Sequence, residues 1–516
     1  MTVPVAERHS ARPRLSPTGW YGEVAAAVVG GASVLAFAPF GIWPLAILCP
    51  AILAALWIGV TPRRAFLRGL LYGLAEFLAG IYWIYTAISV VGGAPAWLGI
   101  MLYLALSFAC AVFPGIVGYT ARRLARGPGW VWLAWVPAAW VLLEWVRSFL
   151  LTGFPWLALG YSQVATPLGG YLPVLGVYGA GLACMLVALL LLITLAPGRR
   201  AVTRAAALGG IIALFAAGFG LARVEWTRPA GPPFQASLIQ GNIPQTLKWE
   251  PGMFMRTTNL YGRFTRAHWT SQLIVWPEDA VPLWYEQAAP PLEELAGEAR
   301  MHDAELVLGV PIYDDENDAG YNAVISLGSA HSVYYKRHLV PFGEYFPVPD
   351  WIKQWLSAHA LPYSSFTPGA FMQPPLAVGR WQAAVANCYE IAFGRLLITQ
   401  LPAAEFILNL SDDGWFGSSI ALPQQFQMAQ IAARETGRYV LAATDDGITG
   451  IIDQHGTVRA TLPTHTVGVL TGEITPLAGT TPYVRVGNWA IAILCGALLV
   501  LTFGLALRAR HASRGY

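Results

Sequence analysis

Long apolar segments separated by short connections are the feature that most constrains the fold of this chain. About 20 apolar residues cross the hydrocarbon core of a bilayer, and eight segments approach that length. Only 12% of the residues are charged, which is well below the share typical of soluble domains. We therefore expect a polytopic α-helical membrane domain with eight spans. The expected spans lie near 21–38, 42–60, 66–88, 96–120, 129–149, 172–196, 205–222 and 487–507.

Arginine is concentrated in every second connection between these segments, with Arg147 as the main exception. Short loops rich in lysine and arginine remain on the cytoplasmic side of a membrane. This pattern predicts that both termini are cytoplasmic and that the long stretch before the last segment is exported. The expected parts are residues 1–222 with seven transmembrane helices, an exported domain at 223–486, and an eighth transmembrane helix with a cytoplasmic tail at 487–516.

Two carboxylates lie inside expected spans, where charges are costly. Glu144 is one helical turn from Arg147, which predicts a structural ion pair. Glu76 has no partner nearby in the sequence, and no role for it follows from the pattern.

The exported stretch has a different pattern, in which short apolar strands alternate with amphipathic helices. This alternation predicts an α/β domain whose sheets are covered by helices. Strands are expected near 235–240, 272–276, 305–310, 321–327, 332–336, 380–387, 405–410, 439–444, 448–453 and 468–473, and helices near 253–268, 290–302, 390–400 and 422–437.

Three polar residues follow strand-like runs in this domain. Glu278 ends QLIVWPE, Lys336 ends HSVYYK, and Cys388 ends WQAAVANC. Catalytic groups of α/β domains tend to lie just past the carboxyl ends of strands. Together the three residues supply a base, a cation and a nucleophile, which are the parts needed for acyl transfer. Taken separately, each residue has a simpler interpretation. Glu278 begins a turn, Lys336 is solvated at a strand end, and Cys388 is a small buried apolar residue.

Cys388 is also the only one of the five cysteines that lies outside the apolar segments. A single thiol cannot close a disulfide within its domain, and an oxidising compartment makes a spare thiol a liability. This position favours a chemical use of Cys388.

Several longer motifs carry a family resemblance. WPED, YYKRHLVPFGEYFP, NCYEIAF and LNLSDDGWFG resemble the nitrilase (carbon–nitrogen hydrolase) superfamily. QGNIPQTLKW, QMAQIAARETGRY and the eight expected spans resemble the bacterial apolipoprotein N-acyltransferase family. The resemblance implies an α-β-β-α sandwich for the exported domain. It also implies transfer of a fatty acyl chain from a phospholipid to the N-terminal amine of a diacylglyceryl-modified cysteine, by a ping-pong thioester mechanism that completes lipoprotein maturation.

The resemblance implies a Glu278–Lys336–Cys388 triad, with Glu278 as base and Lys336 as stabiliser of the oxyanion. The backbone N–H of Tyr389 is expected as a second donor. Glu344 and Glu390 are expected to be needed for activity, and an equally good explanation of their role is that they hold Lys336 in place.

Aromatic residues near these motifs are candidates for substrate binding, namely Trp249, Trp415, Phe416, Phe342 and Phe346. The stretch 342–366, together with Phe154 and Trp156, is expected to frame a mouth that faces the bilayer. The alternative is that these aromatic residues pack the exported domain onto the spans.

Some positions depart from the family pattern. Asp412 stands where asparagine is commoner, Asp445 and Asp446 replace amides, and Asn387 replaces an aliphatic residue. These changes are expected to alter local hydrogen bonding without touching the triad.

The expected partners are a phosphatidylethanolamine-like acyl donor, a diacylglyceryl apolipoprotein acceptor and the bacterial cytoplasmic (inner) membrane, with the chain acting as a monomer. The formal charge of +3 does not suggest nucleic-acid binding, and no cofactor or metal motif is present in the sequence. Two other functions remain possible on the sequence alone, a membrane-tethered nitrilase-type amidase and a transporter with an external binding module.

Overall fold

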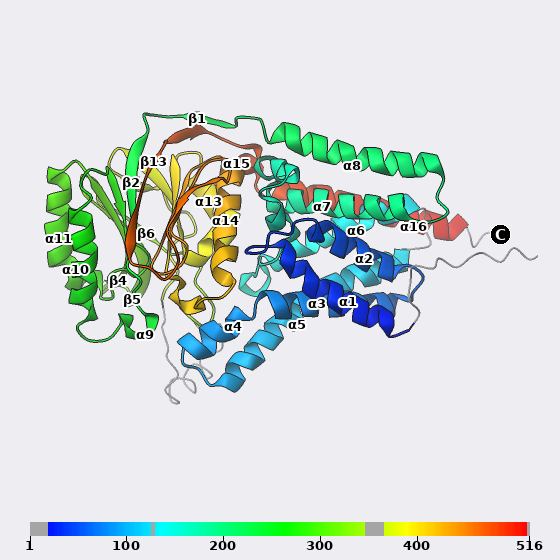
Figure 1. The fold of residues 1–516 in the computed structure, drawn as a ribbon, viewed down its shortest axis with the longest axis horizontal. Helices are drawn as coiled ribbons and strands as arrows, with labels where there is room; N and C mark the ends of the chain where they lie inside the picture. Colours follow the sequence, from blue (N-terminus) through cyan, green and yellow to red (C-terminus); the bar gives the residue numbers. More distant parts are fainter. Residues whose placement is uncertain (1–18, 125–128, 346–365, 513–516) are drawn as a thin grey trace, which may run out of the picture.

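The computed structural model describes residues 19–124, 129–345 and 366–512. Figure 1 shows two parts, a bundle of helices on one side and a pair of β-sheets on the other. The helical domain contains α1 (Tyr21–Ser33), η1 (Val34–Ala36), α2 (Leu45–Trp57), α3 (Pro62–Gly80), α4 (Trp83–Tyr85), η2 (Thr86–Val91), α5 (Ala96–Leu124), α6 (Gly129–Arg147), η3 (Leu150–Thr152), η4 (Leu159–Gln163), η5 (Pro167–Tyr171), α7 (Leu172–Leu195), α8 (Ala201–Leu221) and α16 (Trp489–Ala512).

A helix lies at each of the segments expected to span the membrane. Within the described ranges, four helices are long and apolar enough to cross a bilayer, and a fifth crossing results if α3 and the helices after it form one span bent by 50°. Helices α1 and α2 are apolar but shorter. The presence of apolar helices is confirmed, while the eight spans and their orientation stay predictions.

The second part is built on two six-stranded sheets with the strand orders β13-β2-β3-β4-β5-β6 and β12-β11-β10-β9-β8-β7. The strands are β2 (Phe234–Gln240), β3 (Leu273–Val275), β4 (Glu305–Asp314), β5 (Ala319–Leu327), β6 (Ser332–Tyr335), β7 (Leu376–Val378), β8 (Trp381–Asn387), β9 (Phe406–Ser411), β10 (Val440–Thr444), β11 (Gly450–Ile452), β12 (Val458–Thr461) and β13 (Gly468–Ile474), with β1 (Thr227–Pro229) and β14 (Leu477–Gly479) pairing separately.

Each sheet has one face on its partner sheet and one face under helices. Apolar residues such as Val275 of one sheet and Leu408 of the other share a single buried core. Helices α10 (Met253–Arg266) and α11 (Tyr285–Met301) cover the outer face of the first sheet, while α13 (Gly394–Leu397) and α14 (Ala421–Thr436) lie between the second sheet and the helical domain (Figure 1). The expected α-β-β-α sandwich is therefore observed. The remaining helices are α9 (Gln245–Lys248), η6 (Cys388–Ala392), η7 (Ile398–Gln400), η8 (Asp413–Phe416) and α15 (Pro482–Val486).

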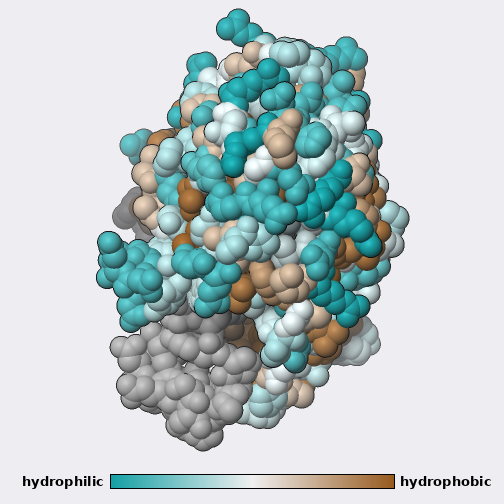
Figure 2. Space-filling model, turned by 90° about the vertical axis from the view of Figure 1, so that its left-hand side faces the viewer, coloured by the Kyte–Doolittle hydropathy of each residue, from teal (hydrophilic) through white to brown (hydrophobic). Residues whose placement is uncertain are grey.

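Helix α14 joins the two domains through polar side chains. The Gln424 side chain donates to the Gly80 carbonyl at 3.2 Å, and Gln427 accepts from the Ala38 N–H at 3.3 Å. Glu435 accepts from the Val177 N–H at 2.6 Å. The opposite end of the sandwich has a mainly hydrophilic surface (Figure 2).

Two local expectations were wrong, and four short strands were not expected. The helix expected at 390–400 is divided into η6, α13 and η7, because Phe393 is non-helical (φ −114°, ψ 77°) and buries its ring against His338. Strands β1, β7, β12 and β14, each of three or four residues, were not expected. The ion pair expected between Glu144 and Arg147 is not formed, because Glu144 accepts from the Trp140 indole and Arg147 donates to a backbone carbonyl.

Candidate active site

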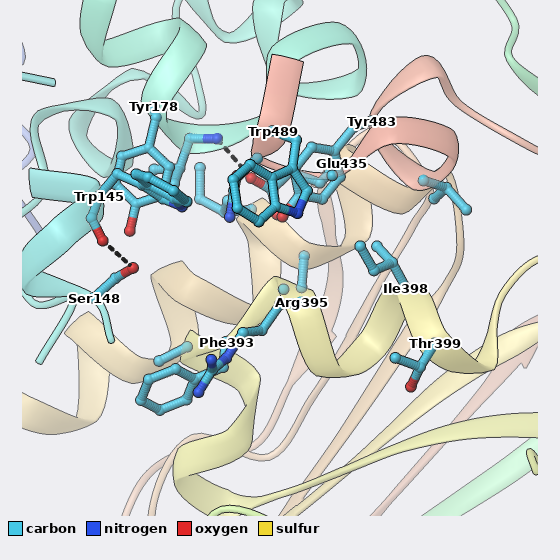
Figure 3. Close-up of a pocket in the computed structure, with 18 of the residues that line it drawn as sticks. Trp145, Ser148, Tyr178, Phe393, Arg395, Ile398, Thr399, Glu435, Tyr483 and Trp489 are labelled. Atoms are coloured by element: carbon cyan, nitrogen blue, oxygen red, sulfur yellow. Dashed lines mark hydrogen bonds between the residues drawn. The ribbon is translucent and has the colours of Figure 1, made fainter. Parts of the chain in front are cut away.

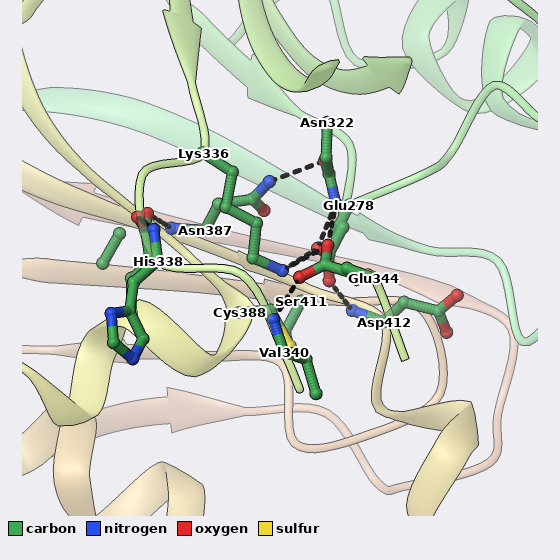
Figure 4. A network of polar contacts seen from close by, with 12 residues as sticks. Glu278, Asn322, Lys336, His338, Val340, Glu344, Asn387, Cys388, Ser411 and Asp412 are labelled. Atoms are coloured by element: carbon green, nitrogen blue, oxygen red, sulfur yellow. Dashed lines mark hydrogen bonds and ion pairs between the residues drawn. The ribbon is translucent and has the colours of Figure 1, made fainter. Parts of the chain in front are cut away.

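The three residues expected at strand ends come together at one edge of the sandwich. Lys336 directly follows β6 and Cys388 directly follows β8, while Glu278 lies three positions after β3. Strands β3 and β6 run in the same direction in their sheet, so their carboxyl ends share an edge. Figure 4 shows Glu278, Lys336 and Cys388 from these elements side by side.

Lys336 and two glutamates form the charged centre of the site. The Lys336 Nζ lies 2.8 Å from Glu278 Oε1 and 2.9 Å from Glu344 Oε1. Burial alone lowers the pKa of Lys336, but the two carboxylates outweigh it and raise this pKa well above its ordinary range. Burial alone raises the pKa of Glu278, but the Lys336 charge outweighs it and holds this pKa below its ordinary value. Both groups are therefore ionised at neutral pH.

Asn322, in the middle of β5, connects the carboxylates. Its Nδ2 donates to Glu278 Oε1 and to Glu344 Oε1, each at 2.8 Å, and its Oδ1 accepts from Asn387 Nδ2 at 2.8 Å. The backbone N–H of Asp412 donates to the second Glu278 oxygen at 3.0 Å. Sequence reasoning missed Asn322, although an amide within the apolar strand AGYNAVISL was a usable signal.

Cys388 lies on a strained turn. Its φ is 54°, a left-handed conformation that costs roughly 1–2 kcal/mol for a residue with a side chain. The residue is buried, and burial together with the neighbouring Glu278 raises the pKa of the thiol well above its ordinary value, although Lys336 acts in the opposite direction. The resting site thus pairs a protonated thiol with an ionised glutamate.

Glu390 holds this turn to the one that carries Lys336. Its Oε1 accepts from the backbone N–H groups of Arg337 and His338 at 2.8 and 3.0 Å. Its Oε2 accepts from the Asn387 N–H at 2.9 Å and from the Tyr334 hydroxyl at 2.7 Å. Glu344 contacts Lys336 directly, whereas Glu390 acts on the backbone beside it.

A second buried lysine lies behind the site. Lys248 Nζ is 2.6 Å from Asp412 Oδ2 and 3.4 Å from Asp445 Oδ2. Burial raises the pKa of Asp412 to about 6 even though Lys248 lowers it. Asp412 and Asp445, two of the residues that depart from the family pattern, thus face Lys248. No local sequence pattern pointed to this lysine. Within the described ranges, His, Cys, Asp and Glu side chains form no group of three or more that could hold a metal ion.

Both domains match known families. Residues 29–190 match the apolipoprotein N-acyltransferase N-terminal domain, and residues 235–483 match the carbon–nitrogen hydrolase domain. A protein of Methylococcus capsulatus named apolipoprotein N-acyltransferase is 40% identical over 94% of this chain and 96% of its own. The chain belongs to the apolipoprotein N-acyltransferase family.

A relative of the same name from Nitrosomonas europaea is 40% identical over 93% of this chain and 97% of its own. Among solved structures, Saccharomyces cerevisiae Nit3 of the nitrilase superfamily is 16% identical, with a TM-score of 0.35 over 47% of this chain and 90% of that one. The family assignment rests on the sequence relatives and the two domain matches.

In this member of the N-acyltransferase family, the residue after the cysteine contacts the helical domain. The Tyr389 hydroxyl donates to the Gly153 carbonyl at 2.7 Å, and its ring stacks on Trp156 at 5.6 Å between centroids. Arg147 donates to the Trp156 carbonyl at 2.7 Å, and Glu144 accepts from the Leu159 N–H at 3.0 Å. The two charged residues of α6 therefore hold the segment against which Tyr389 rests.

The aromatic residues expected to bind substrate have different environments. Trp249 and Phe342 are 50% and 40% exposed, and Trp415 is 37% exposed. Phe416 packs edge-on against Trp83 of the helical domain at 5.0 Å, which fits the packing alternative. Phe346 and most of the stretch 342–366 lie outside the described residues.

Proposed function

We propose that this N-acyltransferase moves a fatty acyl chain from a phospholipid to the N-terminal amine of a diacylglyceryl-modified apolipoprotein through a thioester at Cys388. The observation that carries this mechanism is the placement of the buried Cys388 beside the ion pair of Glu278 and Lys336, whose Oε1 and Nζ are 2.8 Å apart (Figure 4). Such a set supplies a nucleophile, a base and an oxyanion stabiliser.

In the first half-reaction, the Cys388 sulfur attacks the ester carbonyl of the phospholipid while Glu278 takes the thiol proton. Negative charge develops on the carbonyl oxygen and is stabilised by Lys336, with the Tyr389 N–H as a second donor. The ester C–O bond then breaks, Glu278 returns the proton to the departing oxygen, and a lysophospholipid leaves. The acyl group stays on Cys388.

In the second half-reaction, the neutral α-amine of the modified cysteine attacks the thioester. Glu278 takes a proton from the attacking nitrogen, the C–S bond breaks, and the proton passes to the Cys388 sulfur. The product is an amide, which is more stable than the thioester, so no nucleotide is required. Glu344, Asn322 and Glu390 keep the reacting groups in position.

We further propose that a monomer acts in the bacterial cytoplasmic membrane, with both termini cytoplasmic and residues 223–486 in the periplasm. The alternating arginine-rich connections support this orientation. The contact of Tyr389 with Gly153 and Trp156 supports a site that opens toward the bilayer, where a phosphatidylethanolamine-like donor and the lipidated acceptor are both anchored.

The decisive experiment follows a labelled acyl chain from phospholipid to a synthetic diacylglyceryl peptide. Transfer that depends on Cys388, with a peptide product resistant to hydroxylamine, is the expected result. Release of free fatty acid without peptide acylation would instead indicate a hydrolase and contradict the proposal.

A further inference from the structure

A cavity of about 600 Å³ lies between the helical domain and the sandwich. Figure 3 shows Trp145, Tyr178 and Trp489 on one side of it and Phe393, Arg395 and Ile398 on the other. The described residues that line it do not include Glu278, Lys336 or Cys388. The Phe393 ring forms part of its wall and packs against Tyr389 at 4.8 Å, so the cavity borders the nucleophile turn without opening onto the thiol.

The rim of the cavity belongs to the ends of two apolar helices. Trp145 near the end of α6 and Trp489 at the start of α16 meet edge-to-face, with centroids 5.4 Å apart. Trp489 is 66% exposed, and the neighbouring Phe149 is exposed as well. Tryptophan at the ends of apolar helices is typical of the headgroup level of a bilayer. The cavity therefore lies where lipid headgroups would be.

The charges in the cavity favour an anion. Arg395 of α13 and Arg485 of α15 both line it, and neither has an ion-pair partner in the part of the chain that the structure describes. The carboxyl that lines it, Glu435, is bonded to the Val177 N–H, and burial raises the pKa of Glu435 to about 8. At neutral pH it is mostly protonated, so the net charge of the cavity is positive.

We propose that this cavity binds an anionic phospholipid that is not the acyl donor, with its phosphodiester contacted by Arg395 and Arg485 and its chains lying along α6 and α16. Guanidinium groups match phosphate oxygens in geometry and charge. A headgroup that carries its own ammonium would face two arginines, so phosphatidylglycerol is favoured over phosphatidylethanolamine.

The test uses ether-linked phosphatidylglycerol, which carries no acyl ester to transfer. Native mass spectrometry of the full chain in detergent counts bound lipid during a titration. The wild type is expected to bind one such lipid about tenfold more tightly than the ether-linked phosphatidylethanolamine. Arg395→Gln combined with Arg485→Gln is expected to remove this preference. Both side chains are exposed, so the double variant is expected to fold.

Arg256→Gln is the matched control, because Arg256 is an exposed arginine on α10 at the far end of the sandwich. It should bind the lipid as the wild type does. Equal lipid affinity in the wild type and the double variant, or an equal loss in the control, would overturn the proposal.

Two further binding experiments distinguish a phospholipid from other ligands that could occupy the cavity. Soluble glycerophosphoglycerol is expected to compete poorly, and competition at the same concentration as the lipid would indicate a free phosphodiester site instead. A diacylglyceryl peptide whose binding falls in the double variant, with lipid binding unchanged, would assign the cavity to the acceptor and contradict the lipid site.

Discussion

The hydroxyl of Tyr389 donates to the carbonyl oxygen of Gly153, which links the residue after the nucleophile to the helical domain. Tyr389→Phe removes this bond and keeps the stack on Trp156, so we expect acyl transfer to slow by several-fold, in line with a loss of about 1 kcal/mol. Single-turnover acylation measures the effect. Tyr313→Phe, at the half-buried end of β4, is the control, and an equal rate in both variants would remove the role assigned to this contact.

The thioester predicts a covalent intermediate. Incubation with phospholipid alone should add one acyl mass to the protein, and hydroxylamine should remove it. Cys388→Ser should prevent this addition, because an alkoxide is much harder to form than a thiolate. Comparing the intact masses of the wild type and Cys388→Ser distinguishes Cys388 from the four cysteines of the helical domain, and acylation that persists in the variant would exclude Cys388 as the acylated residue.

The ion pair of Glu278 and Lys336 predicts a loss of acylation rate when either member is replaced. Lys336→Ala should slow thioester formation by about 10²–10³, because an oxyanion donor is lost. Glu278→Gln should slow it similarly by removing the base while keeping the shape of the side chain. Lipid binding of both variants should match the wild type. A wild-type acylation rate in either variant would show that its assigned role is wrong.

The amide of Asn322 lowers the pKa of Glu278 by donating to its carboxylate. Asn322→Ala should therefore raise the pKa of the base and move the acidic limb of the pH–rate profile to higher pH, since only the ionised form accepts a proton. Asn317→Ala, at an exposed turn, should leave the limb in place. If the acidic limb of the pH–rate profile does not move in Asn322→Ala, the assignment of Glu278 as the base is contradicted.

Gly309 lies directly beneath the turn that carries Glu278. A Cβ at this position would approach Glu278 Cα to 2.6 Å, so Gly309→Ala should displace the base. We expect a loss of about 1–3 kcal/mol in stability and a lower kcat. Gly297→Ala on α11 is the matched control, because a Cβ there would meet only the end of an arginine side chain at 3.8 Å. Thermal unfolding and initial rates of Gly309→Ala and Gly297→Ala check this prediction.

Two buried aspartates, Asp413 and Asp446, predict a stability that falls as pH rises. Burial raises the pKa of Asp413 to about 7 and that of Asp446 to about 8, both above the value in the unfolded chain. The folded state therefore binds more protons between about pH 4 and 8, and its advantage is lost as pH rises through these values. The Tm should drop from pH 6 to pH 8, and Asp413→Asn should flatten the drop. If Tm falls with pH as steeply in Asp413→Asn as in the wild type, groups other than Asp413 cause the fall.

Sequence alone predicted the elements that are specified locally. The apolar length of the helical segments and the alternation of the longer strands were sufficient for most of the fold. Glu278, Lys336 and Cys388 were found because each is a chemically reactive or charged residue at or within three positions of the end of an apolar strand. The structure places these three residues together, and their catalytic roles stay predictions that the experiments above address.

The parts that sequence missed depend on partners far apart in the chain. Lys248 is buried only because Asp412 and Asp445 arrive from two neighbouring strands of the other sheet. The four bonds of Glu390 join β6 to the turn after β8, and no spacing rule connects these segments. The break at Phe393 arises from packing against His338, which a helical pattern cannot reveal.

Helix α14 has a consequence for how such proteins can change over evolution. Its Gln424, Gln427 and Glu435 side chains each satisfy a backbone group of the helical domain, and backbone groups cannot be replaced by substitution. These contacts therefore depend on the side chains of α14 and not on the side chains of the bundle. A chimaera that joins this sandwich to the bundle of a relative should keep all three bonds, whereas a sandwich that lacks these three side chains should lose them.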